Sequence, residues 1–220
     1  MWENSPVKSS VAPLLRALHR AYPRADCALA HRNPFELLIA TILSAQCTDA
    51  RVNEVTPVLF GRFPNAEALA RAPLGEVETI IRSTGFFRQK ALSLLATARR
   101  LVEKHRGEVP RSFEALLELR GVARKTANVV MGTAFGEATG VVVDTHVRRL
   151  SNRLGLTRES DPVKIERDLV KRLPRKDWIW YSHALISHGR AVCKAQSPRC
   201  PECVLRTLCP FPARSARRVA

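Results

Sequence analysis

Two side chains that could carry out a reaction lie close together in the sequence, the amine of Lys125 and the carboxylate of Asp144. The segment that holds them, residues 119–146, reads LRGVARKTANVVMGTAFGEATGVVVDTH. It contains a short turn with Gly121, and a helical pattern follows from Arg124. A turn that leads into a helix presents unpaired backbone N–H groups, which suit a phosphate. An amine, a carboxylate and a phosphate-holding turn in one short segment predict chemistry on a nucleic acid.

Lys125 is the candidate nucleophile, because only a primary amine can form a Schiff base with a sugar carbon. It falls in the first turn of the expected helix, where the helix dipole disfavours the ammonium form. Asp144 could accept the proton of the amine or stabilise positive charge that develops on the sugar. The residues alone do not separate these two roles, and Asp144 is equally suited to cap the helix that follows. The alternative for Lys125 is a solvated surface lysine.

Four of the six cysteines lie in one stretch with the spacing C-x6-C-x2-C-x5-C: Cys193, Cys200, Cys203 and Cys209. Disulfides are rare in a reducing compartment, so gathered thiolates indicate a metal centre there. Zinc sites usually pair two tight Cys-x-x-Cys knuckles, whereas only one pair is tight here. The spread of the outer cysteines therefore favours a 4Fe–4S cluster over a single zinc ion, with two disulfides as a further alternative. Cys27 and Cys47 stand in apolar helical patterns and are expected to be core residues.

The chain of 220 residues has 36 Lys and Arg against 20 Asp and Glu, a formal net charge of +16. Such a surplus favours a polyanionic partner, because each neutralised phosphate releases counterions; a basic proteome or a ribosome-bound protein would give the same surplus. With 45% hydrophobic residues, the chain is globular in composition rather than disordered. The first residues, MWENSPVKSS, lack the apolar core of a signal peptide, and no apolar run approaches the ~20 residues that span a bilayer. We therefore expect a cytoplasmic protein.

Nearly every periodic segment of the chain has the spacing of an α-helix. The expected helices are 11–22, 34–43, 49–60, 66–72, 74–84, 89–105, 112–119, 124–136, 144–154, 161–173 and 177–192. Asn33, Pro34 and Glu36 form a capping-box pattern at the start of the second of these helices. Because that helix is apolar on most sides, we expect it to be central and buried. The β-branched run 141–143 is too short to build a sheet.

The expected helices are too many for one small core, so we predict an all-α fold with two domains. Residues 30–138 would form a helical bundle that includes the turn before Arg124. Residues 1–29 would join residues 139–220 in a second helical domain, which holds the four clustered cysteines.

The chain resembles the endonuclease III family, DNA glycosylases of the helix-hairpin-helix superfamily. The resemblance rests on LRGVARKTANVVM and VVVDTH, on LSAQCTD at 43–49, on TGFFRQKA at 84–91, on HGR at 188–190 and on the cysteine spacing. It extends from about residue 34 to residue 210. It implies a two-lobed helix-hairpin-helix glycosylase with a 4Fe–4S cluster, acting as a monomer on duplex DNA. It also implies a cytoplasmic protein of bacterial type that is associated with the nucleoid when on DNA. The implied activity is excision of oxidised pyrimidines such as thymine glycol by base flipping, then Schiff-base formation by the lysine and β-elimination at the abasic site.

By position in these motifs, the resemblance makes Lys125 the nucleophile and Asp144 the catalytic carboxylate. It places Gln46 and Phe86 where family members insert side chains into the space left by the flipped nucleotide. The residues that it assigns to binding DNA through the hairpin are Gly121, Val122, Ala123 and Arg124. From the residues alone, Gln46 would be a helix-terminal polar residue and Phe86 a core aromatic.

The hairpin departs from the family pattern Leu-Pro-Gly-Val-Gly at two positions, because Arg120 replaces the proline and Ala123 the second glycine. If the backbone at Ala123 needs a positive φ, alanine costs roughly 1 kcal/mol there. Phe86 is bulkier than the aliphatic residue usual at its position, and the interval from Lys125 to Asp144 is one residue longer. These departures bear on activity and substrate range rather than on fold.

Two alternative functions compete with this interpretation. An adenine-mismatch glycosylase of the same superfamily would carry the cysteine cluster, but it would lack the hairpin lysine and have a further C-terminal domain. Lys125 and the end of the chain at Ala220 argue against that enzyme. The second alternative is a DNA-binding or redox-sensing module that recognises damage without cleaving, and the unusual hairpin residues Arg120 and Ala123 keep it open.

Overall fold

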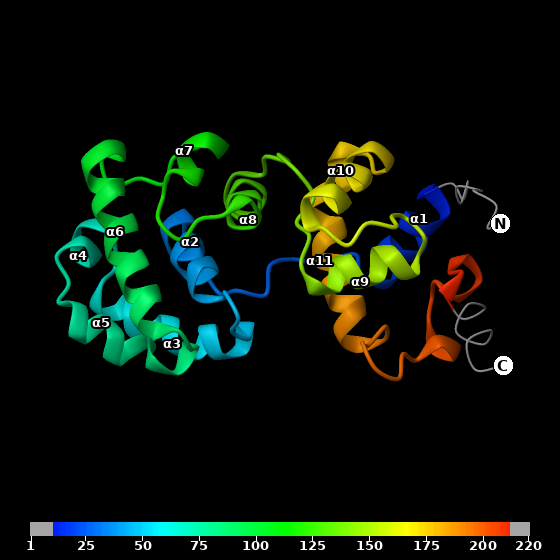
Figure 1. The fold of residues 1–220 in the computed structure, drawn as a ribbon, viewed down its shortest axis with the longest axis horizontal. Helices are drawn as coiled ribbons and strands as arrows, with labels where there is room; N and C mark the ends of the chain where they lie inside the picture. The colour runs from blue at the N-terminus through cyan, green and yellow to red at the C-terminus, as the bar shows by residue number, and fades with distance from the viewer. Residues whose placement is uncertain (1–10, 212–220) are drawn as a thin grey trace. The chain divides into compact units, whose positions relative to one another are not determined.

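The structure, a computed structural model, describes residues 11–211. Within this range the chain forms α-helices and short 3-10 helices without any β-strand, so the all-α prediction is confirmed (Figure 1). Among the described helices, none is long and apolar enough to cross a bilayer. Residues 1–10 and 212–220 lie outside the described range. They include the N-terminal segment that lacks a signal-peptide pattern and the two ends of the second predicted domain.

The described residues divide into two compact units. Unit 2 comprises residues 27–139, and unit 1 combines residues 11–26 with residues 140–211. The boundaries expected from the sequence fall close by, between residues 29 and 30 and between residues 138 and 139. The first helix of the chain therefore belongs with the C-terminal part rather than with the helices that follow it.

Unit 2 is built around the helix α2. Its elements are α2 (Pro34–Leu43), α3 (Asp49–Arg62), α4 (Ala66–Ala70), α5 (Leu74–Ile81), the 3-10 helix η1 (Arg82–Thr84), α6 (Phe87–His105), α7 (Phe113–Leu117) and α8 (Arg124–Phe135). Every residue of α2 from Phe35 to Leu43 is buried, and α2 contacts α3, α6 and α8. The prediction of a central, buried helix is therefore confirmed. The long helix α6 packs along α4 and α5.

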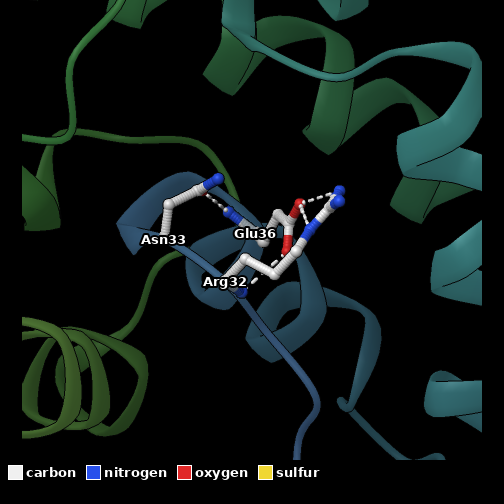
Figure 2. Close-up of polar contacts among 3 residues, drawn as sticks. All are labelled: Arg32, Asn33 and Glu36. Atoms are coloured by element: carbon white, nitrogen blue, oxygen red, sulfur yellow. Dashed lines mark hydrogen bonds and ion pairs between the residues drawn. The ribbon is translucent and has the colours of Figure 1, made fainter.

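The start of α2 is fixed by a network of polar groups at its N-terminus (Figure 2). Asn33 Oδ1 accepts a hydrogen bond from the Glu36 backbone N–H at 2.9 Å, and Pro34 occupies the first helical position. The Glu36 carboxylate is only 2% exposed and accepts from the Arg32 backbone N–H at 2.8 Å and from the Arg32 guanidinium at 2.6 and 2.9 Å. The Asn33 cap is the first half of the capping box that the sequence predicts; the return bond from Glu36 differs, because it goes to the backbone N–H of Arg32, one residue before the cap. These bonds set where the central helix begins.

Unit 1 surrounds a core that includes the fully buried Tyr181. Its elements are α1 (Val11–Ala21), α9 (Thr145–Arg153), α10 (Pro162–Arg172), the 3-10 helix η2 (Arg175–Asp177), α11 (Trp178–Ala191) and the 3-10 helices η3 (Cys200–Glu202) and η4 (Arg206–Leu208). The helix α11 contacts both α1 and α9, although α1 is far away in sequence. Trp180 Nε1 donates to the Tyr22 carbonyl at 2.9 Å, and the Trp180 ring stacks on His19 at 3.5 Å. These contacts hold α1 in unit 1.

The structure differs from the predicted elements in a few places. The helix α6 begins at Phe87 rather than Gln89, directly after Phe86, whose φ of 47° is not helical. The last part of the helix expected over 74–84 is the 3-10 helix η1. Neither Cys27 nor Cys47 lies in a helix: both are half-buried loop residues packed against the unit 2 core. Their apolar neighbours reflect contact with that core rather than a helical stripe.

Candidate active site and metal centre

The hairpin between α7 and α8 makes its turn at Gly121, where the backbone φ is 83°. A Cβ at this position would lie 3.1 Å from Ser93 Cβ and 3.4 Å from Ile42 Cγ2. Glycine is therefore required here both for the left-handed backbone and for the close approach to α6 and α2. Val122 is buried and anchors the turn to the core of unit 2. The predicted turn is thus held rigidly against two helices.

Ala123 has an extended backbone, with φ −95° and ψ 172°, and immediately precedes α8. A residue of any type adopts this conformation, so alanine in place of glycine causes no backbone strain. The cost of roughly 1 kcal/mol that alanine would carry at a positive φ therefore does not arise. Because alanine has no polar side chain, it leaves the first turn of α8 without the side-chain cap that Ser, Thr, Asp or Asn would supply.

The N-terminus of α8 is strongly basic. Arg124 and Lys125 are its first two residues, both are exposed, and the first turn contains no acidic residue. The Arg124 guanidinium lies over the Phe113 ring, 5.2 Å from its centroid, which holds it beside the hairpin. Arg120 is exposed within the hairpin. An exposed amine, a positive helix terminus and neighbouring guanidinium groups together can engage a phosphodiester and a sugar.

Gln46 and Phe86, the two predicted insertion residues, share an unusual backbone conformation. Their φ angles are 52° and 47°, in the left-handed region that bulky residues rarely adopt, at a cost of roughly 1–2 kcal/mol each. Both side chains are exposed, and Phe86 retains 67% of its accessible surface. The structure therefore excludes the interpretation of Phe86 as a core aromatic. Two strained, exposed turns in unit 2 present a long polar side chain and an aromatic ring to solvent.

Asp144 lies in unit 1, at the N-terminus of α9. Its Oδ1 accepts a hydrogen bond from the Val147 backbone N–H at 2.7 Å, so the capping role anticipated from the sequence is present. Behind it, Arg149 donates through Nη2 to the carbonyls of Gly189 at 3.1 Å and Cys193 at 3.0 Å. Burial, and secondly the nearby charge of Arg153, lower the pKa of Arg149. Asp144 and its helix are thereby joined to the segment that carries the first clustered cysteine.

The four clustered cysteines of unit 1 line one common cavity: Cys193, Cys200, Cys203 and Cys209. All six cysteines of the chain are free, so the structure does not support the disulfide alternative. Within the described residues, no three His, Cys, Asp or Glu side chains converge closely enough to hold one metal ion. The four thiols around one cavity are nevertheless the donor type that zinc and iron–sulfur centres use.

The surroundings of this cavity disfavour the charged, thiolate forms of two of its cysteines. Burial raises the pKa values of Cys203 and Cys209, and the neighbouring cysteines raise them further, against the backbone N–H groups of Leu205 and Phe211. A cationic metal centre would supply the missing countercharge to the thiolates.

Two side chains outside the cysteine motif reach its sulfurs. Arg153 donates through Nη1 to Cys193 Sγ at 3.2 Å and to the Lys194 carbonyl at 2.7 Å. His188 Nε2 lies 3.4 Å from Cys203 Sγ. Hydrogen bonds of this kind orient metal-bound thiolates and tune them. Sequence reasoning did not identify Arg153, because an arginine on an amphipathic helix resembles any solvated one; His188 belongs to the HGR motif, which was a usable signal.

Comparison with known proteins places the chain in a family. Residues 39–175 match the HhH-GPD superfamily of base excision DNA repair proteins. The all-α fold and the basic hairpin before α8 agree with this class of protein. The chain is 56% identical to endonuclease III of Synechocystis sp. over 92% of this chain and 93% of that protein. It is 39% identical to endonuclease III of Escherichia coli K12, over 93% and 96% of the two chains. Within the superfamily, the chain belongs to the endonuclease III family.

Solved structures agree with this assignment. A non-covalent complex of endonuclease III with DNA matches with a TM-score of 0.88 and 46% identity, covering 94% of this chain and 97% of that one. A trapped covalent intermediate of endonuclease III with DNA matches with a TM-score of 0.88 and 45% identity, over the same shares of the two chains.

Proposed function

We propose that this chain is a bifunctional DNA glycosylase and AP lyase that excises oxidised pyrimidines, such as thymine glycol, from duplex DNA. The observation that carries the proposal is the exposed amine of Lys125 at the basic start of α8, directly after a hairpin held rigid at Gly121. The trapped covalent DNA intermediate of a similar endonuclease III supports a mechanism in which a protein side chain bonds covalently to DNA.

Lys125 is the proposed nucleophile. Its neutral amine attacks C1′ of the extruded nucleotide, the N–C1′ bond forms, and the bond from C1′ to the base breaks as the base leaves with a proton. Ring opening then gives a Schiff base between Lys125 and the sugar. Loss of a proton from C2′ expels the 3′ phosphate by β-elimination, and water releases the lysine by hydrolysis of the iminium. One side chain thereby accounts for both base removal and strand cleavage.

Asp144 is the proposed catalytic carboxylate. The cap of α9 uses Oδ1, and we assign Oδ2 to the reaction, where it stabilises positive charge on the sugar or accepts the amine proton. The cap bond to the Val147 backbone N–H orients the carboxylate, and the hydrogen bond from Arg149 to the Cys193 carbonyl fixes the helix α9 that follows it. A fixed carboxylate stabilises a developing cation without the reorganisation that water would require.

Gln46 and Phe86 are the proposed insertion residues for base flipping. Extrusion of a nucleotide costs a few kcal/mol in lost stacking and pairing. The Gln46 amide can donate and accept hydrogen bonds with the orphaned base, and the exposed Phe86 ring can stack on neighbouring bases. Their outward, strained turns suit insertion better than packing within the protein.

The hairpin is the proposed phosphate grip. Its residues with this role are Gly121, Val122, Ala123 and Arg124. Backbone N–H groups at the start of α8, assisted by the helix dipole, bind a phosphate without reading sequence. The extended backbone of Ala123 leaves this grip unstrained, which removes one of the two reasons for favouring a module that binds damage without cleaving.

A 4Fe–4S cluster is the proposed cofactor, with Cys193, Cys200, Cys203 and Cys209 as its ligands. When bound, the cluster would offset part of the charge of the four thiolates and cross-link the loop from Cys193 to Cys209. That loop carries Lys194 and Arg199, both exposed and suited to a DNA backbone. We propose that unit 1 is the cluster domain, that unit 2 is the domain of the hairpin, and that the protein acts as a monomer on duplex DNA with oxidised pyrimidine or abasic sites.

Borohydride trapping tests the proposed function. Native protein should form a covalent adduct with a duplex that carries one thymine glycol, and Lys125→Met should form none, because methionine cannot give an iminium. Lys104→Met, which removes another exposed lysine of unit 2 in the last turn of α6, should trap like native protein.

Each other result of the trapping experiment has a definite meaning. An adduct with Lys125→Met would assign the nucleophile to a different amine. Absence of any adduct with native protein that still binds an abasic duplex would favour the damage-binding module.

A further inference from the structure

One buried amine of unit 2 takes no part in the proposed chemistry. Lys90 lies in the first turn of α6 and is only 6% exposed, although lysine is almost never buried unless its ammonium is hydrogen-bonded. Its Nζ donates to the Leu43 carbonyl at 2.8 Å and to the Thr84 carbonyl at 2.7 Å. Both partners are backbone atoms from segments that the chain separates widely from each other.

The two carbonyls occupy equivalent places in the fold. Leu43 is the last residue of α2, and Thr84 is the last residue of the 3-10 helix η1. Carbonyls at the end of a helix lack a partner within the helix, so each needs another donor. Directly after these ends come the turns of Gln46 and Phe86. One amino group therefore links the two helix ends from which the turns with the proposed insertion residues begin.

These two turns need such a restraint. Gln46 and Phe86 both hold left-handed backbones that side chains disfavour, and conformations of this kind persist only where the surroundings determine them. Local hydrogen bonds support each turn separately: Ser44 Oγ donates to the Thr41 carbonyl at 2.8 Å, and Thr84 Oγ1 donates to the Ile81 carbonyl at 2.8 Å. The Lys90 ammonium adds a connection from one turn to the other.

The same face of α6 also supports the hairpin. Thr97 Oγ1 donates to the Arg120 carbonyl at 2.7 Å, and Ser93 lies so close to Gly121 that a Cβ on the glycine would be 3.1 Å from Ser93 Cβ. Positions 90, 93 and 97 share one side of a helix because of its 3.6-residue period. A single side of α6 thus contacts the hairpin and the helix ends before the Gln46 and Phe86 turns, the three places in unit 2 to which the proposed function assigns DNA contacts.

We propose that Lys90 is a positioning residue for base extrusion, fixing the spacing of the Gln46 and Phe86 turns so that both side chains enter the duplex together. This inference rests on the proposed function of Gln46 and Phe86. Lys90 itself does not touch the reacting sugar, because both of its hydrogen bonds are directed into the protein. A misplacement of about 1 Å in either turn would lower the rate of duplex cleavage by roughly 100-fold.

The connection does not require a charged group. Burial lowers the pKa of Lys90, and the nearby Cys47 opposes part of that effect. A neutral amine still has two N–H bonds, one for each carbonyl. Donor geometry, rather than charge, therefore carries the link, and a side chain of similar shape without donors removes it.

The test compares two reactions of one variant. Lys90→Met keeps the length and apolar stem but has no donor. Cleavage of a duplex with thymine glycol in a single turnover requires extrusion, whereas borohydride trapping on single-stranded abasic DNA does not, because a single strand has no partner base to leave. We expect the duplex rate to fall roughly 10- to 100-fold while trapping on the single strand stays within about 3-fold of native.

Leu101→Ala is the matched control. It changes a fully buried residue on the same helix, about three turns further along, and it destabilises the fold without removing the connection. For this variant, the rate of duplex cleavage divided by the rate of trapping on the single strand should equal the native value. If Lys90→Met does not fold, Lys90→Gln replaces it, since its amide is shorter and cannot reach both carbonyls, and the same ratio decides.

The outcomes separate the two proposals. An unchanged ratio of the two rates in the Lys90 variant, or an equal fall of both reactions, would overturn the positioning role and leave the proposed function intact. Native protein without activity on either substrate would overturn the proposed function, and the role of Lys90 with it. A selective loss on the duplex would support both.

Discussion

The proposed nucleophile and insertion residues of unit 2 are exposed, whereas the candidate carboxylate and a candidate ligand sulfur of unit 1 are held by internal hydrogen bonds. In unit 2, Lys125, Gln46 and Phe86 are exposed, and the last two occupy strained backbone conformations. In unit 1, Asp144 caps α9, and the sulfur of Cys193 accepts a hydrogen bond from Arg153. The first arrangement is suited to a partner that arrives from outside, and the second to holding a group or a charge in place.

This difference has a physical consequence for substitutions. Exposed, strained residues contribute little to folding, so their replacement should change activity while stability stays constant or rises. Residues held by buried hydrogen bonds contribute to both, because an unpaired buried partner costs roughly 1–3 kcal/mol. The predictions below test whether the two units follow these separate patterns.

The largest expected effect is at the cysteine cavity. Cys203→Ser should reduce bound iron well below about four ions per chain and lower the free energy of unfolding by more than about 3 kcal/mol, since metal binding is coupled to folding. Iron analysis and hydrogen exchange measure the two effects. Exchange should become faster in α9 and α11 of unit 1, while α2 and α8 of unit 2 keep their protection.

Cys47→Ser is the control for this prediction, because Cys47 is half-buried in unit 2 and lies outside the cavity. It should retain the native iron content. Faster exchange in both units after Cys203→Ser would show that the units do not differ in what holds them together. Full iron content in that variant would remove Cys203 from the ligand set.

The next effect separates the two roles of Asp144. Asparagine caps helices about as well as aspartate, so Asp144→Asn should keep thermal stability within about 0.5 kcal/mol of native. The charge is lost, and the single-turnover rate of base removal should fall by roughly 100- to 10,000-fold. Asp144→Ala should lose the same activity and, in addition, about 1 kcal/mol of stability with the cap. Equal activity of native protein and Asp144→Asn would reduce Asp144 to a structural cap.

The elements that sequence reasoning predicted well are those with local signals. Asn33, Asp144 and Asp161 all accept a hydrogen bond from the backbone N–H three residues ahead, as their capping patterns require. Apolar spacing gave the helices because burial of one face dominates their stability. The approach of the four clustered thiols to one cavity followed from their types and spacing, since thiolates gathered in a reduced protein indicate a metal centre.

The features that sequence reasoning missed depend on contacts between distant segments. Lys90 stands on an amphipathic helix where most lysines are solvated, and its two carbonyl partners lie in other elements. The left-handed backbone at Phe86 has no signature in the residue type, because phenylalanine rarely adopts it. Arg153 bonds a sulfur forty residues away along the chain. Such positions are set by tertiary packing, which overrides local preference.

The smallest expected effect tests whether strain at Phe86 serves activity. Phe86→Gly should raise the free energy of unfolding by about 1 kcal/mol, because glycine adopts the φ of 47° without steric cost. The same change removes the stacking ring, so cleavage of a thymine glycol duplex should fall by roughly 10-fold, from a loss of about 1–3 kcal/mol of base–aromatic stacking. Thermal unfolding and single-turnover cleavage measure the two quantities on one sample.

Phe86→Ala is the matched variant, since it removes the ring but keeps the steric cost of a Cβ at a left-handed backbone. It should lose the same activity as Phe86→Gly without the gain in stability. If the glycine variant is no more stable than the alanine variant, the backbone there is not strained, and the contrast between the two units rests on exposure alone. If instead both variants cleave the duplex at the native rate, Phe86 is an exposed residue without a part in base extrusion. Its left-handed backbone then belongs only to the turn that precedes α6.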